Sequence, residues 1–294
     1  MIDGIHVRVH GKSLLNIMCS DKLDFRNVGN KNESKYKGLI ITVFTSSLTC
    51  LIRGSIHKFY NDGLHNADLF TLQDFQAALE QLEIELCIYP DDLQLLRIEI
   101  GMNVPINYST RSFIEMIALI NGKKPTRIKY GVELKFNQYS IKVYAKSLQY
   151  KNFTQDNIIR IEVAYARMIK FRHDIGHAVT LKDLLNKHLW NKMIEVLEFV
   201  ISRISIFDYS DLDKESMSNK EQLIFFEWSN PIRLAQEPGR IKRYRFRKKV
   251  MELYEQYSEN IRFNDFNNSA KRILDEIASN IKDTAMPNCN ILQL

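Results

Sequence analysis

Apolar and polar residues alternate with a period of two in several short stretches of the first 175 residues. Because side chains of a β-strand point to opposite faces in turn, such stretches predict half-buried strands. The predicted strands cover residues 39–44, 48–57, 95–103, 127–136, 139–146 and 158–165. Apolar residues at helical spacing predict one helix that starts near Thr71, with a capping pattern at Thr71 and Asp74, and a second that starts at Ser109 or Thr110 and stops at Gly122.

The order of these elements is β-β-α-β-α-β-β-β, and the connections are too short for many parallel crossovers. This order predicts an α+β fold in which helices cover one face of an antiparallel sheet. From about Val179 the apolar spacing becomes helical, with further helices expected at 222–228, 241–257 and 269–281. We therefore expect a first domain over residues 1–175 and a helical, basic C-terminal region over residues 176–294.

The alternation also sorts polar side chains by face, and the same pattern recurs on several strands. Arg97 and Glu99 share one face of their strand, and Arg160 and Glu162 share one face of theirs. The other residues expected on this polar face are Arg53, Ser55, His57, Lys142, Tyr144 and Lys146. A solvated sheet face with cross-strand Arg–Glu pairs would give the same alternation, so a purely structural interpretation stays open.

This set of residue types suits cleavage of a phosphodiester. A tyrosine hydroxyl has a pKa of about 10 and is a poor nucleophile at neutral pH. A cation such as Lys146 on the same face would favour the phenolate of Tyr144. A divalent ion held by Glu99, Glu162 and an imidazole would act as a Lewis acid on the phosphate. Oxygen ligands together with an imidazole suit Mg²⁺ or Mn²⁺. The product would be a phosphotyrosine ester, which keeps the bond energy for rejoining.

Charge adds a second hint of a polyanionic partner. The 294 residues have a net charge of +6, and the isoelectric point is about 9.0. The densest basic run is residues 240–249, where Tyr244 and Phe246 stand between the cations. Basic runs with aromatics suit phosphate contacts and base stacking, although a solvated helix face would look the same. The residues expected to bind DNA are Arg97, Arg160, Arg243, Arg245, Arg247 and Lys248.

Other features of the composition argue against several classes of protein. No stretch approaches the roughly 18 uninterrupted apolar residues that a membrane span needs. The first residues lack the order of a signal peptide, so we expect a cytoplasmic protein with no membrane partner. The four cysteines form no CxxC pair and predict neither a zinc knuckle nor a disulfide scaffold.

Several short motifs occur in a fixed order along the chain. They are Met1-Ile2-Asp3 with Val7-Arg8-Val9, Gly54-Ser55-Ile56-His57-Lys58 followed by His65-Asn66, Arg97-Ile98-Glu99, Tyr144-Ala145-Lys146, Ile159-Arg160-Ile161-Glu162, and Ile175-Gly176 followed by Thr180-Leu181-Lys182-Asp183-Leu184. In this order and rough spacing, from residue 1 to about 205, the chain resembles the gene II replication initiators of filamentous phages and their plasmid relatives.

The resemblance implies a fold related to the histidine-bearing rolling-circle endonucleases. It implies that Tyr144 takes the 5′ phosphate of a nicked strand, leaves a 3′ hydroxyl for extension and later allows rejoining, with Lys146 assisting. It implies His65, Glu99 and Glu162 as ligands of Mg²⁺ or Mn²⁺. The implied partner is DNA at a replication origin, single-stranded or supercoiled, together with host helicase and polymerase. The implied location is the cytoplasm of a bacterial host.

Some alternatives stay open at this stage. The loop before His65 is longer than the family's, and Leu64 stands where the family has Gly, so His57 is the alternative ligand. Tyr165 also follows an Arg-x-Glu strand, but alternation places it on the apolar face, which predicts a core residue. A non-catalytic nucleic-acid-binding protein, with Tyr144 stacked on a base, is a second function; bare carboxylates would repel phosphate there. A related transposase or mobilisation relaxase is a third.

Overall fold

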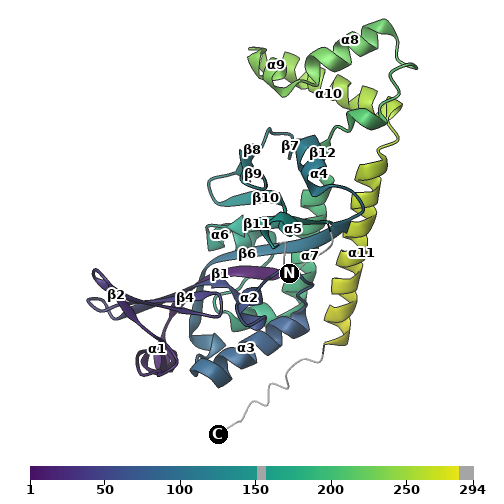
Figure 1. Ribbon diagram of the computed structural model, residues 1–294. Coiled ribbons are helices and arrows are strands. Elements are labelled where there is room, and N and C mark those ends of the chain that lie inside the picture. The colour runs from purple at the N-terminus through teal and green to yellow at the C-terminus, as the bar shows by residue number, and fades with distance from the viewer. Residues whose placement is uncertain (151–156, 285–294) are drawn as a thin grey trace.

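The computed structural model describes residues 1–150 and 157–284, and within this part of the chain ten strands form one antiparallel sheet (Figure 1). The order across the sheet is β2-β3-β4-β5-β1-β6-β11-β10-β9-β8. The bounds are β1 Ile2–Val9, β2 Arg26–Val28, β3 Lys31–Tyr36, β4 Leu39–Phe44, β5 Thr49–Ser55, β6 Leu93–Ile106, β8 Thr126–Ile128, β9 Gly131–Lys135, β10 Tyr139–Ala145 and β11 Asn157–Tyr165. A separate pair joins β7 (Ile117–Ile120) to β12 (Ile204–Ile206). The predicted α+β fold with a large antiparallel sheet is confirmed.

The helices differ widely in length. Their bounds are α1 Gly11–Met18, α2 Ile56–Tyr60, α3 Leu72–Leu86, α4 Thr110–Met116, α5 Lys146–Gln149, α6 Met168–Asp174, α7 Lys187–Ser202, α8 Asn219–Trp228, α9 Pro231–Gln236, α10 Arg240–Tyr257 and α11 Ile261–Asp283. The predicted capping box of α3 is present: the Thr71 side chain accepts from the Asp74 amide, and the Asp74 side chain accepts from the Thr71 amide.

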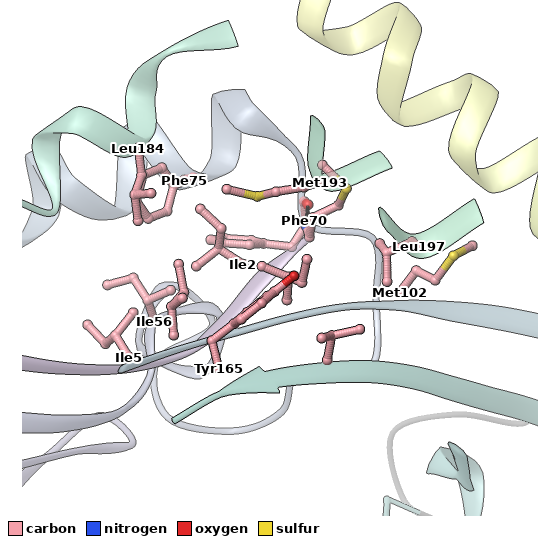
Figure 2. Close-up of a cluster of buried hydrophobic side chains, with 14 of the residues drawn as sticks. Ile2, Ile5, Ile56, Phe70, Phe75, Met102, Tyr165, Leu184, Met193 and Leu197 are labelled. Carbon is pink, nitrogen blue, oxygen red and sulfur yellow. Dashed lines mark hydrogen bonds between the residues drawn. The ribbon is translucent and has the colours of Figure 1, made fainter. Parts of the chain in front are cut away.

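The apolar face of the central strands is covered by helices. Figure 2 shows Ile2, Phe75, Met193 and Leu197 packed together between the strands and the helices. Tyr165 lies in the same core, is 1% exposed and donates to Asp174 Oδ2 at 3.2 Å, so its predicted place on the apolar face is confirmed. Burial of these large side chains is the main favourable term that holds the helices on the sheet.

This core does not divide at residue 175. Trp190 of α7 and Phe266 of α11 belong to the same apolar cluster as Ile98 of β6. A smaller second cluster joins α8 and α10 and consists of Phe207, Leu212, Met217, Phe225, Val250, Leu253 and Tyr254. In Figure 1, α8, α9 and α10 lie together at one end of the molecule, and α11 runs from there back alongside the sheet.

Some local predictions were wrong, mostly at the ends of elements. His57 lies in α2 and Lys146 is the first residue of α5, although both were expected on strands. The expected strand 127–136 is the hairpin of β8 and β9, with a turn at residues 129–130. The helix capped by Ser109 ends at Met116, because the next four residues form strand β7, which pairs with β12. The strands and the helix of residues 1–36 were not predicted.

Candidate active site on the polar face of the sheet

Three neighbouring strands bring the expected site residues together. In the register of β10 with β11, Lys142 lies opposite Glu162 and Tyr144 lies opposite Arg160. On the other side of β11, Ala164 lies opposite Glu99 of β6. Because side chains alternate along each strand, these polar residues share the face that the core helices leave uncovered. The grouping expected from alternation is therefore present.

A cleft of about 970 Å³ lies over this face. Carboxylates, cations and aromatic rings line it together, which is an unusual mixture for a simple solvated sheet. Its charged and tyrosine lining residues are Asp3, Arg53, Lys58, Arg97, Glu99, Lys129, Tyr130, Lys142, Tyr144, Lys146, Tyr150 and Glu162. Large concave sites with a few convergent polar groups are where ligands bind in most proteins.

Tyr144 presents its hydroxyl to a carboxylate in this cleft. The hydroxyl donates to Glu162 Oε2 at 3.1 Å. Burial raises the pKa of Tyr144 above its usual value, Arg160 opposes the rise, and Glu162 adds to it. The sequence had led us to expect that Lys146 would lower this pKa, and the environment has the opposite net effect.

Glycine 131 makes room for Tyr144 on the neighbouring strand. Gly131 is the cross-strand partner of Tyr144. A Cβ atom built at this position would lie 2.2 Å from the Val143 carbonyl oxygen and 2.5 Å from the Tyr144 Cβ. Since these are backbone and near-backbone atoms that cannot swing aside, β9 can lie this close to the tyrosine only with a glycine here.

Lys146 is buried beside the tyrosine. Lys146 is 1% exposed. Its Nζ lies 5.6 Å from the centre of the Tyr144 ring and 4.8 Å from the centre of the Tyr150 ring. Burial and the charge of Arg160 lower the pKa of Lys146 to about 7. An amine with such a pKa exchanges a proton readily near neutral pH, which suits a general base.

Arg160 is an internal residue of the site. It is 2% exposed, and its guanidinium donates to Asp3 Oδ2 at 2.8 Å, to Asn103 Oδ1 at 2.9 Å and to Glu162 Oε2 at 3.5 Å. We expected it to bind DNA, but it is buried and bonded to residues of β1, β6 and β11. Arg97 of β6, which was also expected to bind DNA, is exposed.

Asp3 is a site residue that the sequence analysis missed. It is 4% exposed and accepts from Ser55, from Asn66 Nδ2 at 2.7 Å and from Arg160. Burial alone would raise the pKa of Asp3, but Arg160, Lys146 and these hydrogen bonds lower it to about 2. Plain alternation would place Asp3 with Ile5 on the apolar face. A β-bulge between Ile2 and Ile5 reverses its direction, and a lone acid in an apolar run was the available signal.

The expected metal ligands are not assembled as a group. Lys142 Nζ lies 2.6 Å from Glu162 Oε1 and 3.6 Å from Glu99 Oε1, so an ammonium joins the two carboxylates. Burial and the nearby Glu162 raise the pKa of Glu99. Among the described residues, no three His, Cys, Asp or Glu side chains gather so that they could hold a metal ion. As arranged, the site does not fit a divalent ion on His65, Glu99 and Glu162.

Both candidate histidines face Asp68 instead. His57 Nε2 lies 2.7 Å from Asp68 Oδ1, and His65 Nδ1 lies 3.5 Å from the same oxygen. His57 is buried and stacks on Phe70, with ring centres 4.4 Å apart. Asn103 Nδ2 on β6 donates to the Asp68 carbonyl at 3.0 Å, which fixes the loop between α2 and α3 on the polar face.

The basic helix α10 lies outside the cleft, and its cations are of two kinds, exposed ones and ones that donate to backbone carbonyls. Arg245 and Lys248 are exposed. Arg243 donates to the Glu237 carbonyl at 2.7 Å, and Arg247 donates to the Gly122 carbonyl. Of the two aromatic residues expected to stack on bases, Tyr244 is 65% exposed. Phe246 is already stacked on Trp228, with ring centres 3.8 Å apart.

In the part of the chain that the structure describes, none of the helices has the length and apolar content to cross a membrane. Comparisons with known proteins give little further help. No family model and no curated protein matches the chain. A solved structure described as the rolling circle replication initiator protein from Geobacillus stearothermophilus is similar, with a TM-score of 0.41 and 10% sequence identity. The similarity covers 74% of this chain and 90% of that one.

Proposed function

We propose that the chain is a DNA nicking enzyme that uses Tyr144 as its nucleophile and starts rolling-circle replication of a phage or plasmid. The observation that carries the proposal is the Tyr144 hydroxyl, held by Glu162 at 3.1 Å in a cleft of about 970 Å³ that is rich in cations. A nucleophile in hydrogen-bond contact with an acceptor and beside a base is the arrangement that covalent catalysis needs.

The proposed step is a transesterification. The Tyr144 oxygen forms a bond to the phosphorus of the scissile phosphodiester, and the bond from phosphorus to the 3′ oxygen breaks. The hydroxyl proton of Tyr144 passes to the neutral amine of Lys146 while Glu162 orients the hydroxyl, and the ammonium so formed returns a proton through water to the departing 3′ oxygen. The reverse attack by a 3′ hydroxyl on the phosphotyrosine rejoins the strand.

The cations of the cleft have the second task of holding the DNA. Arg53, Lys58, Arg97 and Lys129 line the cleft together with the site residues. Cationic side chains in a groove attract the phosphate backbone and supply most of the affinity for a nucleic acid. We propose that this groove receives a single strand at the origin, while the exposed cations of α10 hold the adjacent duplex.

The requirement for Mg²⁺ or Mn²⁺ stays a prediction to be tested. A divalent ion would supply charge neutralisation at the attacked phosphate. The carboxylates that would hold it are paired with Lys142, so no step of the proposed mechanism depends on it. Host polymerase, which would extend the free 3′ hydroxyl, and host helicase, which would unwind the duplex, belong to the same proposal.

The first test is a nicking assay on supercoiled DNA that carries the element's own origin, with Mn²⁺, Mg²⁺ or a chelator. We expect a nick with protein on the 5′ end, and Tyr144→Phe to lower its rate by roughly a thousandfold or more because the nucleophile is gone. Tyr165→Phe is the matched control, since Tyr165 is the rival tyrosine and lies on the opposite face of the sheet. An adduct that persists in Tyr144→Phe would refute the assignment.

A second function is favoured by one specific observation. Lys142 and Arg160 neutralise Glu162, so the carboxylates do not repel phosphate as bare groups would. The face could therefore bind a nucleic acid without cleaving it, with Tyr144 stacked on a base. Origin binding by the wild type and by Tyr144→Phe, with no nick from either protein, would support this function.

A further inference from the structure

A lysine joins the two carboxylates that the sequence marks as metal ligands. The distance from Lys142 Nζ to Glu162 Oε1 is 2.6 Å, which is a short charge-assisted hydrogen bond. The same nitrogen lies 3.6 Å from Glu99 Oε1. The ammonium therefore lies where an ion held by both carboxylates would have to lie.

Strand register places the lysine there. Lys142 of β10 lies directly opposite Glu162 of β11 on one side and Glu133 of β9 on the other. Cross-strand neighbours have Cβ atoms roughly 5 Å apart, so these contacts follow from the pairing of the strands. The Glu162 side chain is 4% exposed, and a carboxylate so deeply buried needs a partner charge.

A divalent ion and this ammonium compete for the same oxygens. Two cations a few ångströms apart in a partly buried site repel each other strongly. No third ligand compensates for that repulsion, because both histidines face Asp68 and the described residues contain no other suitable group of three. The space between Glu162 Oε1 and Glu99 Oε1 can therefore hold one cation at a time, while Arg160 stays on Glu162 Oε2.

We propose that Lys142 is the resident cation of the Glu99–Glu162 pair, and that a divalent ion binds this pair only after the ammonium has left it. The inference rests on the proposed function for its catalytic meaning, because nicking is the reaction for which these two carboxylates are expected to bind a metal. The Lys142 side chain is 27% exposed, and Glu133 beside it offers a third carboxylate to which the ammonium can turn.

The test is a titration with Mn²⁺ alone, without DNA, in which free Mn²⁺ is followed by electron paramagnetic resonance. We expect Lys142→Met and Lys142→Gln to bind one Mn²⁺ at least about tenfold more tightly than the wild type, because the competing charge is removed. Lys170→Met is the matched control. The Lys170 side chain on α6 is as exposed as that of Lys142, at 27%, and pairs with Asp174 at 2.5 Å, but it does not line the cleft, so its loss should leave the affinity unchanged.

Further outcomes decide the matter. Adding Glu99→Gln to Lys142→Met or Lys142→Gln should abolish the gain. The proposal is overturned if the wild type binds Mn²⁺ as tightly as both Lys142 variants. Circular dichroism checks folding, and Lys142→Gln keeps a donor for the buried Glu162 should Lys142→Met unfold. Because this measurement contains no DNA, it can fail or succeed independently of the nicking assay.

Discussion

Charged side chains serve in opposite ways in the cleft and on helix α10. In the cleft they are bound to one another: Arg160 is 2% exposed and donates to two other charged residues, Asp3 and Glu162. On α10, Arg245 and Lys248 are exposed to solvent, and the buried residues of this helix belong to the separate small apolar cluster. The same residue types therefore act within a buried network around Arg160 and as solvated charges at the exposed positions of α10.

Because the charges are buried in one region and exposed in the other, the two regions should respond differently to substitution. A buried charge without its partner keeps its desolvation cost, so one change in the network has a large effect. Exposed charges are screened by salt and contribute small amounts that add up. Effects of cleft substitutions should therefore be large and pH-dependent, whereas effects on α10 should be small and salt-dependent.

The largest effect on stability should come from breaking the buried pair. Arg160→Met leaves Asp3 buried without its cation, and we expect a loss of about 3–5 kcal/mol in the free energy of unfolding. Urea denaturation at pH 7 measures this loss. Adding Asp3→Asn removes the orphaned charge and should restore a large part of the stability. A loss below about 1 kcal/mol, as for a surface pair, would contradict the distinction between the buried network and the exposed charges of α10.

The same pair has a pH signature. The pKa of Asp3 is about 2 in the fold, below its ordinary value near 3.8. Its stabilising contribution is therefore fully present above about pH 4 and is lost as the pH falls through 2. The difference in stability between the wild type and Arg160→Met should narrow over this interval.

A smaller effect, of opposite sign, is expected at Lys146. Between pH 7 and about 10 the unfolded chain holds a proton on Lys146 that the fold does not, so wild-type stability rises with pH across this window. Lys146→Met removes the buried charge, and we expect it to be about 1–3 kcal/mol more stable than the wild type at pH 7, with the advantage shrinking toward pH 10.

The activity of this variant should change in the other direction. Loss of the base should slow nicking by roughly a hundredfold or more and remove the rise of the wild-type rate through about pH 7. Urea denaturation at the two pH values and single-turnover nicking measure the two effects. A variant that is less stable at pH 7, or whose advantage is independent of pH, would argue against a buried, easily deprotonated lysine.

Much of the cleft followed from the sequence because alternation is a local property of a strand. Arg97, Glu99, Tyr144 and Glu162 were placed on one face correctly, and Tyr165 on the other. Alternation fails where the backbone leaves the regular strand: the bulge after Ile2 turned Asp3 toward the site, and β5 gave way to a helix before His57. These events depend on tertiary packing that a single sequence does not reveal.

Pairing between distant residues was equally hidden. The sequence gives the residue types but does not say that Lys142 meets both Glu99 and Glu162, because β6 and β11 become neighbours only in the folded sheet. The burial that raises the pKa of Tyr144 and lowers that of Lys146 is also a property of the assembled fold. The net rise of the tyrosine pKa was not predicted for this reason.

The smallest effects should come from α10, where two kinds of arginine allow a matched test. Arg245→Ala removes an exposed cation, whereas Arg243→Ala removes one whose guanidinium is bound to the Glu237 carbonyl. If α10 contacts the duplex, the first change should reduce the slope of log affinity against log salt by about 0.9, as for the loss of one phosphate contact, and the second should change it less. Filter binding to origin duplex at several salt concentrations measures both slopes. Equal slopes for the wild type and Arg245→Ala would remove α10 from the DNA interface and leave the cleft as the region that binds.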